Sequence, residues 1–396
     1  MPDWRKSTLA FALLGSPLLA SAGAVCADVT LKGVHASADA KSISLPPGLL
    51  NNANALIDLV NSVVGAVGEL WPVIPIEGTW DLSAIYCEPE DGKADTVQIL
   101  AHGATYTKEY FVGHGLESEE DLKKYSWAHY AAEEGYASLA IDRLGQGKSS
   151  NADPILEVQT NLQGEQIKVI SDRLRAGEIV AKTKDGREIG GKKFSKVVLV
   201  GHSLGSAIAC IAAKRNADAF DALILTGWST HLIENFPKAL FGVILPAPLA
   251  APLAHMAKWF KLHIGYLAFI VEPAMRKIFF GPKGSFDPAI QHRDWERRST
   301  VGLGEMLTLF AGMKVVPSYN KPVKVIIGEY DNLLCNKGPK CAEGPTHTPG
   351  DSADIFPASS NYSYSITPGT GHNLNLHYSA RDSYAVAHEF LRHNLD

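Results

Sequence analysis

The chain has 396 residues, of which 46% are apolar and 20% are charged. This composition supplies enough apolar side chains for a large buried core and excludes a disordered or low-complexity protein. The formal net charge is −5, from 37 basic and 42 acidic residues. No basic stripe is present that could neutralise phosphates, so we expect no nucleic-acid partner.

The N-terminus has the features of a secretory signal peptide. Arg5 and Lys6 precede the apolar run Leu9–Leu14, and small residues fill positions 20–24. We therefore expect residues 1–24 to be removed and the rest of the chain to be secreted and extracellular. The alternative is a hydrophobic N-terminal anchor, but the apolar run is short for a membrane span, and we expect no stable membrane insertion.

The cysteines predict two disulfides, because an exported chain meets oxidising conditions. Cys335 and Cys341 lie close together in a loop rich in Pro and Gly and can close a small ring. Cys87 ends a strand-like run, which leaves Cys26 as its natural partner. Cys210 lies in an apolar helical segment and is expected to be a buried free thiol. No Cys or His spacing resembles a metal site, and we expect neither a metal nor a cofactor.

Short aliphatic runs alternate with helix-like segments from residue 96 onward. This alternation is typical of an α/β fold, in which helices cover a mostly parallel sheet. A β-hairpin is expected within residues 179–194, around Asp185-Gly186. The expected strands are Thr96–Ala101, Ala137–Ile141, Lys196–Val200, Ala222–Leu225, Val323–Ile327 and Tyr362–Ile366.

An N-terminal arm at residues 25–79 precedes the alternating pattern. Within it, residues 48–71 carry Leu and Val at helical spacing and predict an amphipathic helix. Its polar side lacks the Lys and Arg of helices that seek membrane surfaces, so we expect the apolar face to pack on the body.

A long insertion at residues 230–319 interrupts the α/β core, which is expected to comprise residues 80–229 and 320–396. The insertion is far longer than an ordinary connection and predicts a helical cap. Residues 239–254 contain no charge, but three prolines break the run, so we interpret it as a lid over an apolar pocket. The alternative is a helical insertion that packs on the body and has no role in binding.

The pentapeptide Gly201-His202-Ser203-Leu204-Gly205 fits the pattern G-x-S-x-G. It follows an aliphatic strand and opens a helix-like stretch, which is the strand-turn-helix context of a nucleophile elbow. In such a turn the serine takes a strained backbone conformation, and the two glycines remove side chains that would collide where helix crosses strand. We expect Ser203 to be the nucleophile at the C-terminal edge of the sheet.

A serine hydroxyl needs a base, so a carboxylate and a histidine should follow the elbow in that order. Asp331 lies just beyond the strand at 323–327, and we prefer it to Glu329 because its spacing places the carboxylate on a turn past the strand end. His372 lies in a Gly-rich loop after the last expected strand. We prefer it to His377, which begins the approach to the final helix.

Acyl transfer also needs donors aimed at the developing oxyanion. One is expected to be the backbone N–H of Leu204, directly after the nucleophile at a helix start. The second should come from the loop after the strand at 96–101; the Ala104 N–H is our choice and that of Gly103 the alternative. Taken alone, His102-Gly103 would be a simple strand-to-loop turn.

With these motifs the chain resembles secreted fungal α/β-hydrolases of the broad esterase/lipase superfamily. The resemblance covers most of residues 80–395, and the cap and the N-terminal arm match it weakly. Besides the elbow, the matching runs are ILAHG at 99–103, YSW at 125–127 with GY at 135–136, IDRLGQGKS at 141–149 and GHNLNLH at 371–377.

The resemblance implies an α/β-hydrolase fold with Ser203, Asp331 and His372 on the triad positions. It also implies that Asp142 and Gly147 belong to a structural turn after a strand. It indicates the type of reaction far better than the substrate.

The expected reaction is acylation of the serine by an ester or lactone of a hydrophobic small molecule, followed by release of the acid to water. A serine at the elbow argues against the dehalogenase and epoxide-hydrolase branches, which need an aspartate there. An acyltransferase, a lyase and a catalytically silent binding protein remain alternatives. Asn361 begins a sequon that could carry a glycan, although it adjoins an expected strand. The sequence leaves the oligomeric state open.

Overall fold

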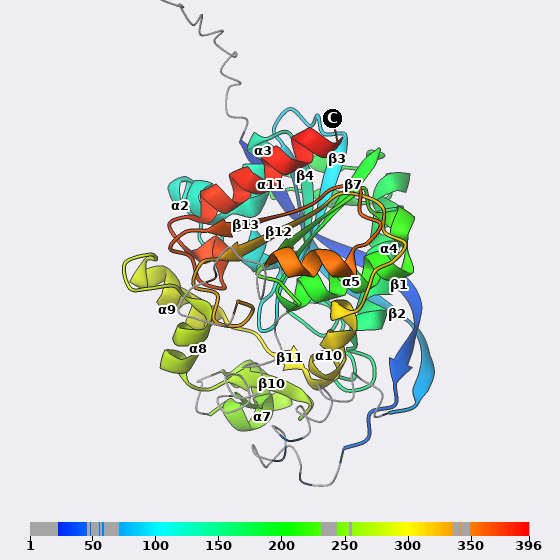
Figure 1. Ribbon diagram of the computed structural model, residues 1–396, viewed down its shortest axis with the longest axis vertical. Helices are drawn as coiled ribbons and strands as arrows, with labels where there is room; N and C mark the ends of the chain where they lie inside the picture. The colour runs from blue at the N-terminus through cyan, green and yellow to red at the C-terminus, as the bar shows by residue number, and fades with distance from the viewer. Residues whose placement is uncertain are drawn as a thin grey trace, which may run out of the picture.

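The computed structural model describes residues 23–45, 71–230, 244–252, 256–335 and 349–395, with the single positions 48, 55, 58 and 341. At its centre lies an eight-stranded sheet in the order β1-β2-β4-β3-β7-β8-β12-β13 (Figure 1). Neighbouring strands from β4 to β13 are parallel, whereas β2 is antiparallel to both β4 and β1. The predicted mostly parallel α/β sheet is confirmed.

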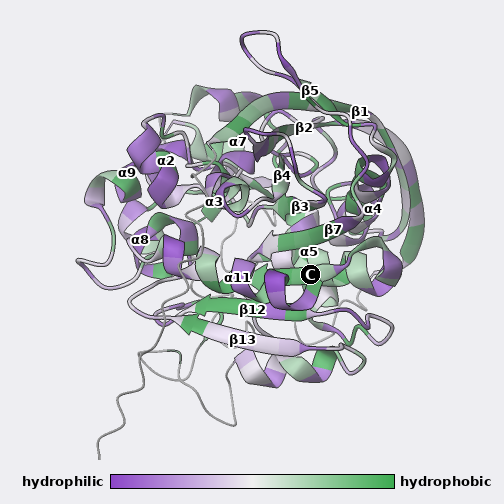
Figure 2. Cartoon of the chain, turned by 90° about the horizontal axis from the view of Figure 1, so that it is seen from above, coloured by the Kyte–Doolittle hydropathy of each residue, from purple (hydrophilic) through white to green (hydrophobic). Residues whose placement is uncertain are grey.

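The six parallel strands lie where the aliphatic runs predict them. Most of their side chains are buried, as expected for strands covered on both faces. The edge strand β13 is the exception, because most of its side chains are only half-buried; Figure 2 shows it paler than its hydrophobic neighbour β12. The strands are β3 (Thr96–Ala101), β4 (Ala137–Ile141), β7 (Lys196–His202), β8 (Ala222–Thr226), β12 (Val323–Gly328) and β13 (Tyr362–Thr367).

Helices flank this sheet in two groups (Figure 1). In one group α11 (Ala380–Leu395) packs against α3 (Trp127–Glu133) and α2 (Glu119–Tyr125), and in the other α4 (Thr160–Ala176) packs against α5 (Leu204–Arg215). The apolar residues of α4 recur at helical spacing and are buried, which explains its docking.

The N-terminal arm differs from the prediction. β1 (Ala24–Lys41) and β2 (Val73–Pro89) form a long antiparallel ribbon that joins the central sheet. From Val34 to Ala40 buried and exposed side chains alternate, which is the period of a half-buried strand. The boundary that we placed between residues 79 and 80 falls inside β2. The amphipathic helix predicted at 48–71 lies almost wholly outside the described residues.

The insertion between β8 and β12 is not purely helical. Its strands β9 (Ile244–Pro246), β10 (Tyr266–Phe269) and β11 (Val301–Gly302) form a small antiparallel sheet. Pro246 ends β9, and the neighbouring α7 spans only Ala247–Ala250, so prolines do limit helix formation here. The other elements are η4 (Ala257–Lys261), α8 (Glu272–Phe279), α9 (Pro288–Arg297), α10 (Leu303–Thr308) and η5 (Leu309–Met313).

The cysteines pair as the sequence predicts. Disulfides join Cys26 to Cys87 and Cys335 to Cys341, and Cys210 is a buried free thiol. The first disulfide ties β1 to β2, and the second lies directly after the loop that follows β12. The predicted hairpin is also present, formed by β5 (Val180–Lys182) and β6 (Glu188–Gly190).

The described residues contain neither a candidate membrane span nor a candidate metal-binding cluster. None of their helices is long and apolar enough to cross a membrane. Within the same part of the chain, no group of three or more His, Cys, Asp or Glu side chains is arranged to hold a metal ion.

Candidate active site

Ser203 lies in the sharp turn between β7 and α5. Its backbone has φ 54° and ψ −116°, a strained conformation for a residue with a side chain. A Cβ on Gly201 would lie 2.5 Å from the backbone of Ser206, and a Cβ on Gly205 would lie 2.0 Å from the Ala101 carbonyl oxygen. Glycine is therefore required at both positions, because neighbouring backbone leaves no room for a side chain. The positive end of the α5 helix dipole points at the serine.

Asp331 is the carboxylate that meets the predicted histidine. Its Oδ2 lies 2.8 Å from Nδ1 of His372, and both residues are only 1% exposed. Its Oδ1 accepts hydrogen bonds from the backbone N–H groups of Leu333 and Leu334 at 2.9 and 3.0 Å. The carboxylate is thus held on both oxygens, in a position to orient the imidazole.

Glu329, the alternative acid, lies elsewhere. Its Oε2 accepts a hydrogen bond from the Gly369 N–H at 2.8 Å, so it supports the loop that carries His372. The two loops approach so closely that a Cβ on Gly328 would lie 2.2 Å from the Gly371 carbonyl oxygen. The loops are also joined by a hydrogen bond of 2.8 Å, which the Tyr330 N–H donates to the Thr370 carbonyl oxygen.

The His372 ring is fixed by aromatic contacts as well as by Asp331. It stacks on Phe279 of the cap at 5.6 Å between centroids and lies 5.0 Å from the His202 ring. Because Nδ1 donates to the carboxylate, Nε2 is left as the proton acceptor. Among the described residues Nε2 has no hydrogen-bond partner, Ser203 included. Such bonds are often long in ligand-free enzymes and tighten when substrate binds.

His377, the alternative base, has a structural role. Its Nδ1 lies 2.7 Å from the Asn373 carbonyl oxygen, and its Nε2 accepts hydrogen bonds from the N–H groups of Gly281 and Gly371 at 2.9 and 3.1 Å. Burial lowers the pKa of His377 to about 4, which keeps the ring neutral. It therefore joins the cap to the loop of His372 and has no free nitrogen for catalysis.

The predicted oxyanion donors lie beside the serine. Ala104 and Leu204 both contribute to the same cavity as Ser203. Gly103 also lies close to the serine, since a Cβ added to Gly103 would lie 3.1 Å from the Ser203 Cβ. Within the described residues the Ala104 N–H donates no hydrogen bond, which leaves it available to a ligand.

The cavity beside Ser203 and His372 is apolar. Among the described residues that line it, the polar side chains are those of Ser203, His372, Thr105, Tyr106 and Trp228. The cap contributes the apolar side chains Ile244, Phe269, Phe279, Val301, Met306, Leu309 and Met313, and the core contributes Ala104, Leu204, Ala207, Leu333 and Leu334.

Several residues at the site were not identified from the sequence. Trp228 follows β8, lines the cavity and has an indole Nε1 without a hydrogen-bond partner among the described residues. Arg143 and Glu305, distant in sequence, form a buried ion pair behind the loop of Ala104. Arg143 lies in the run IDRLGQGKS at 141–149, and Glu305 lies three residues after Gly302 at a helix start, but neither pattern predicts that the two side chains pair.

The turn at Asp142 is structural, as the resemblance implies. The Asp142 carboxylate accepts hydrogen bonds from the backbone N–H groups of Lys108 and Lys148 at 2.8 and 3.0 Å. A Cβ on Gly147 would lie 2.3 Å from that carboxylate, and Gly147 has φ 56°. The pair closes the turn after β4.

Comparisons with known proteins agree with this architecture. Solved structures with the same fold include an esterase from Thermogutta terrifontis, which is 14% identical, with 81% of this chain and 96% of that chain covered and a TM-score of 0.51. A bromoperoxidase from Bacillus anthracis is also 14% identical, with 80% and 96% covered and a TM-score of 0.49. No curated protein matches the sequence. A model of the Alpha/beta hydrolase family matches residues 98–387, and the chain belongs to that family.

Proposed function

We propose that this protein is a secreted serine hydrolase that cleaves an ester or lactone bond of a hydrophobic small molecule. The observation that carries the proposal is the 2.8 Å contact of Asp331 with His372, whose side chain lines the same cavity as the strained Ser203. A nucleophile, a base and an orienting acid in this order and on these loops support acyl transfer.

The reaction would proceed in two halves. Ser203 Oγ attacks the carbonyl carbon while His372 Nε2 takes the hydroxyl proton and delivers it to the leaving alcohol. The N–H groups of Ala104 and Leu204 stabilise the oxyanion, and Asp331 stabilises the imidazolium. Water then attacks the acyl-enzyme through the same base and releases the acid. The neutral, buried His202 and His102 do not compete for protons, because burial lowers the pKa of each well below its usual value.

The cavity lining supports the proposed substrate class. Aliphatic and aromatic side chains from the cap and the core surround the nucleophile, so the acyl or alcohol part that enters should be apolar. A charged substrate would lose hydration there, and the described part of the lining offers it no ionic partner other than the proposed catalytic groups.

Export is supported by the N-terminal pattern and by the two disulfides. The Asn361 side chain is exposed at the start of β13, next to Asn394, so the sequon is accessible to a glycan despite the neighbouring strand. Expression of the chain with its first 24 residues should release the protein into the medium. Its mass should exceed that of the bare chain, and a glycosidase or the Asn361→Gln substitution should remove the excess.

The central test combines covalent labelling with turnover. A fluorophosphonate probe should label wild-type protein at Ser203, and the protein should release p-nitrophenol from acyl esters, with rates that rise from acetate to medium-chain esters. Ser203→Ala should abolish both. Labelling without turnover of any ester or lactone would favour an acyltransferase or lyase, and absence of both would favour a catalytically silent binding protein.

A further inference from the structure

The peptide group between Gly103 and Ala104 is held by two donors on its carbonyl side. Arg143 donates from one guanidinium nitrogen to the Gly103 carbonyl oxygen at 3.2 Å, and the His102 ring nitrogen Nδ1 lies 2.8 Å from the same oxygen. The Nε2 of His102 accepts a hydrogen bond from the Arg143 backbone N–H at 3.3 Å, so Nδ1 carries the proton and donates. Both donors are fully buried.

This arrangement determines where the Ala104 N–H points. The carbonyl and the N–H of a trans peptide point in opposite directions, and the structure contains no cis peptide among the described residues. With the Gly103 oxygen held toward Arg143, the Ala104 N–H is directed to the other side, where Ala104 and Ser203 line the cavity. A rotation of this peptide would turn the carbonyl toward the nucleophile and remove the donor.

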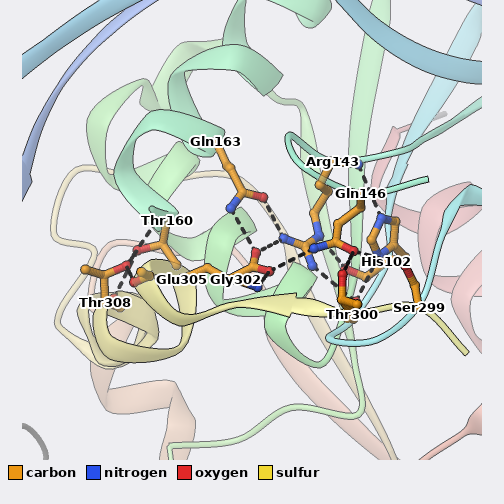
Figure 3. A network of polar contacts seen from close by, with 12 residues as sticks. His102, Arg143, Gln146, Thr160, Gln163, Ser299, Thr300, Gly302, Glu305 and Thr308 are labelled. Carbon is orange, nitrogen blue, oxygen red and sulfur yellow. Dashed lines mark hydrogen bonds and ion pairs between the residues drawn. The ribbon is translucent and has the colours of Figure 1, made fainter. Parts of the chain in front are cut away.

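Arg143 is itself fixed by the cap (Figure 3). It forms an ion pair with Glu305 of α10, and Gln163 of α4 contacts both partners: its Oε1 lies 2.5 Å from the guanidinium and its Nε2 lies 2.9 Å from the carboxylate. A third Arg143 nitrogen donates to the His102 carbonyl oxygen at 2.9 Å. The guanidinium therefore spans the distance from α10 to two successive carbonyls of the loop after β3.

The cap also holds the far end of that loop. The Ser299 N–H donates to the Thr105 carbonyl oxygen at 2.6 Å, and Thr105 has an unusual positive φ of 64°. The Ser299 hydroxyl reaches Gln146 at 3.1 Å, and Gln146 contacts the second oxygen of Glu305 at 3.5 Å. Residues 299–305 of the cap thus hold the loop at both ends.

We propose that Arg143, held by Glu305, is a positioning residue that fixes the orientation of the Gly103–Ala104 peptide and so keeps the Ala104 N–H aimed at the oxyanion. The inference rests on the proposed acyl transfer at Ser203. It couples the cap to the oxyanion hole, because removing the cap contact would release the guanidinium and leave the Gly103 carbonyl held by His102 alone.

A purely structural role for the same ion pair makes a different prediction. A buried pair can be replaced by uncharged side chains with little change in stability, whereas removing one partner leaves an unpaired buried charge. The test therefore uses the double variant Arg143→Met/Glu305→Gln, which removes both charges and keeps an oxygen for the Gly302 N–H that Glu305 now accepts at 3.0 Å. Thr160→Val is the control, because it removes a buried hydrogen bond to Thr308 of α10 without contact to the Gly103 carbonyl.

Each variant is measured for the Tm, for kcat and KM with p-nitrophenyl butyrate, and for inhibition by a trifluoromethyl ketone. The ketone forms a tetrahedral oxyanion with the serine. We expect the double variant to lose about 10- to 100-fold in kcat and a similar factor in ketone affinity, with KM nearly unchanged, since a misplaced donor approaches the loss of one donor. Thr160→Val should lower the Tm and leave all three constants within about 2-fold.

Two results would overturn the inference. The first is that the double variant keeps the wild-type kcat and ketone affinity. The second is that Thr160→Val, at the same Tm as the double variant, shows the same loss in kcat. If the wild-type protein neither hydrolyses esters nor binds the ketone, the proposed function fails instead, so the two failures are distinguishable.

Discussion

The loops of the core at the C-terminal edge of the sheet and the cap above them are held in different ways. In the core, backbone approaches backbone at Gly201, Gly205 and Gly328, where any added Cβ would collide. Backbone also meets backbone where the cap joins the core, since a Cβ on Gly304 would lie 2.5 Å from the Ile155 carbonyl oxygen. Buried polar side chains add to these joints: Glu305 of the cap pairs with Arg143, and His377 of the core accepts a hydrogen bond from the Gly281 N–H of the cap. The predicted catalytic residues are therefore placed by close packing of main chain, while the joints of the cap combine such packing with buried side-chain hydrogen bonds.

The sharpest test of this contrast concerns the two acids that follow β12. Asp331→Asn should lower kcat about 10³- to 10⁴-fold, because an amide cannot hold the imidazole in the required tautomer or stabilise its charge. Glu329→Gln keeps an oxygen for the Gly369 N–H and should change kcat by less than about 3-fold. Steady-state kinetics on both variants decide which residue is the triad acid. A larger loss of kcat in Glu329→Gln than in Asp331→Asn would assign that role to Glu329.

The close backbone packing of the core can be tested at the nucleophile elbow. Gly205→Ala would place a methyl group 2.0 Å from the Ala101 carbonyl oxygen and should lower the free energy of unfolding by more than about 3 kcal/mol. Gly186→Ala is the matched control, since Gly186 has φ 92° but nothing within 4 Å, and it should cost only about 1–2 kcal/mol. Urea unfolding compares them, and equal losses would show that close approach does not determine the elbow.

The cap side of the contrast predicts a change in selectivity. Met306→Ala enlarges the cavity beside the serine and should shift the ratio of kcat/KM for octanoate over butyrate esters by about 10-fold. Met275 of α8 is equally buried but does not line that cavity, so Met275→Ala should affect stability alone. An unchanged ratio in Met306→Ala would show that this part of the cap does not contribute to substrate recognition.

The smallest expected effect is on the pH dependence of stability. Burial lowers the pKa of His388 to about 4, and its ring contacts the Tyr384 carbonyl and Gln98. The unfolded chain has a pKa near 6.5, so unfolding takes up a proton between these values and stability falls as the pH drops below about 6.5. His388→Gln should reduce that uptake by about one proton near pH 5. Thermal unfolding from pH 4.5 to 7.5 measures the slope, and an identical slope in the variant would contradict the assignment.

The sequence was sufficient for everything that rests on local pattern. The aliphatic runs predicted all six parallel strands, and the spacing of glycines around Ser203 predicted the elbow, because both follow from periodicity and backbone sterics. Position relative to a strand end favoured Asp331 over Glu329, and Asp331 is the one of the two that lies 2.8 Å from His372; its catalytic role stays a prediction. The long β1–β2 ribbon was missed although its alternation of side chains was visible, since only one part of β2 had been interpreted as a strand.

The remaining features were decided by tertiary structure. The small sheet of the cap, the ion pair of Arg143 with Glu305 and the joint at His377 connect residues far apart in the chain. No local pattern specifies which of many polar side chains will be buried together, because that choice depends on how separate elements pack and on the requirement that buried polar groups find partners. The elbow at Ser203 could thus be predicted from the chain itself, whereas the contacts that hold the Gly103–Ala104 peptide became visible only in the folded molecule.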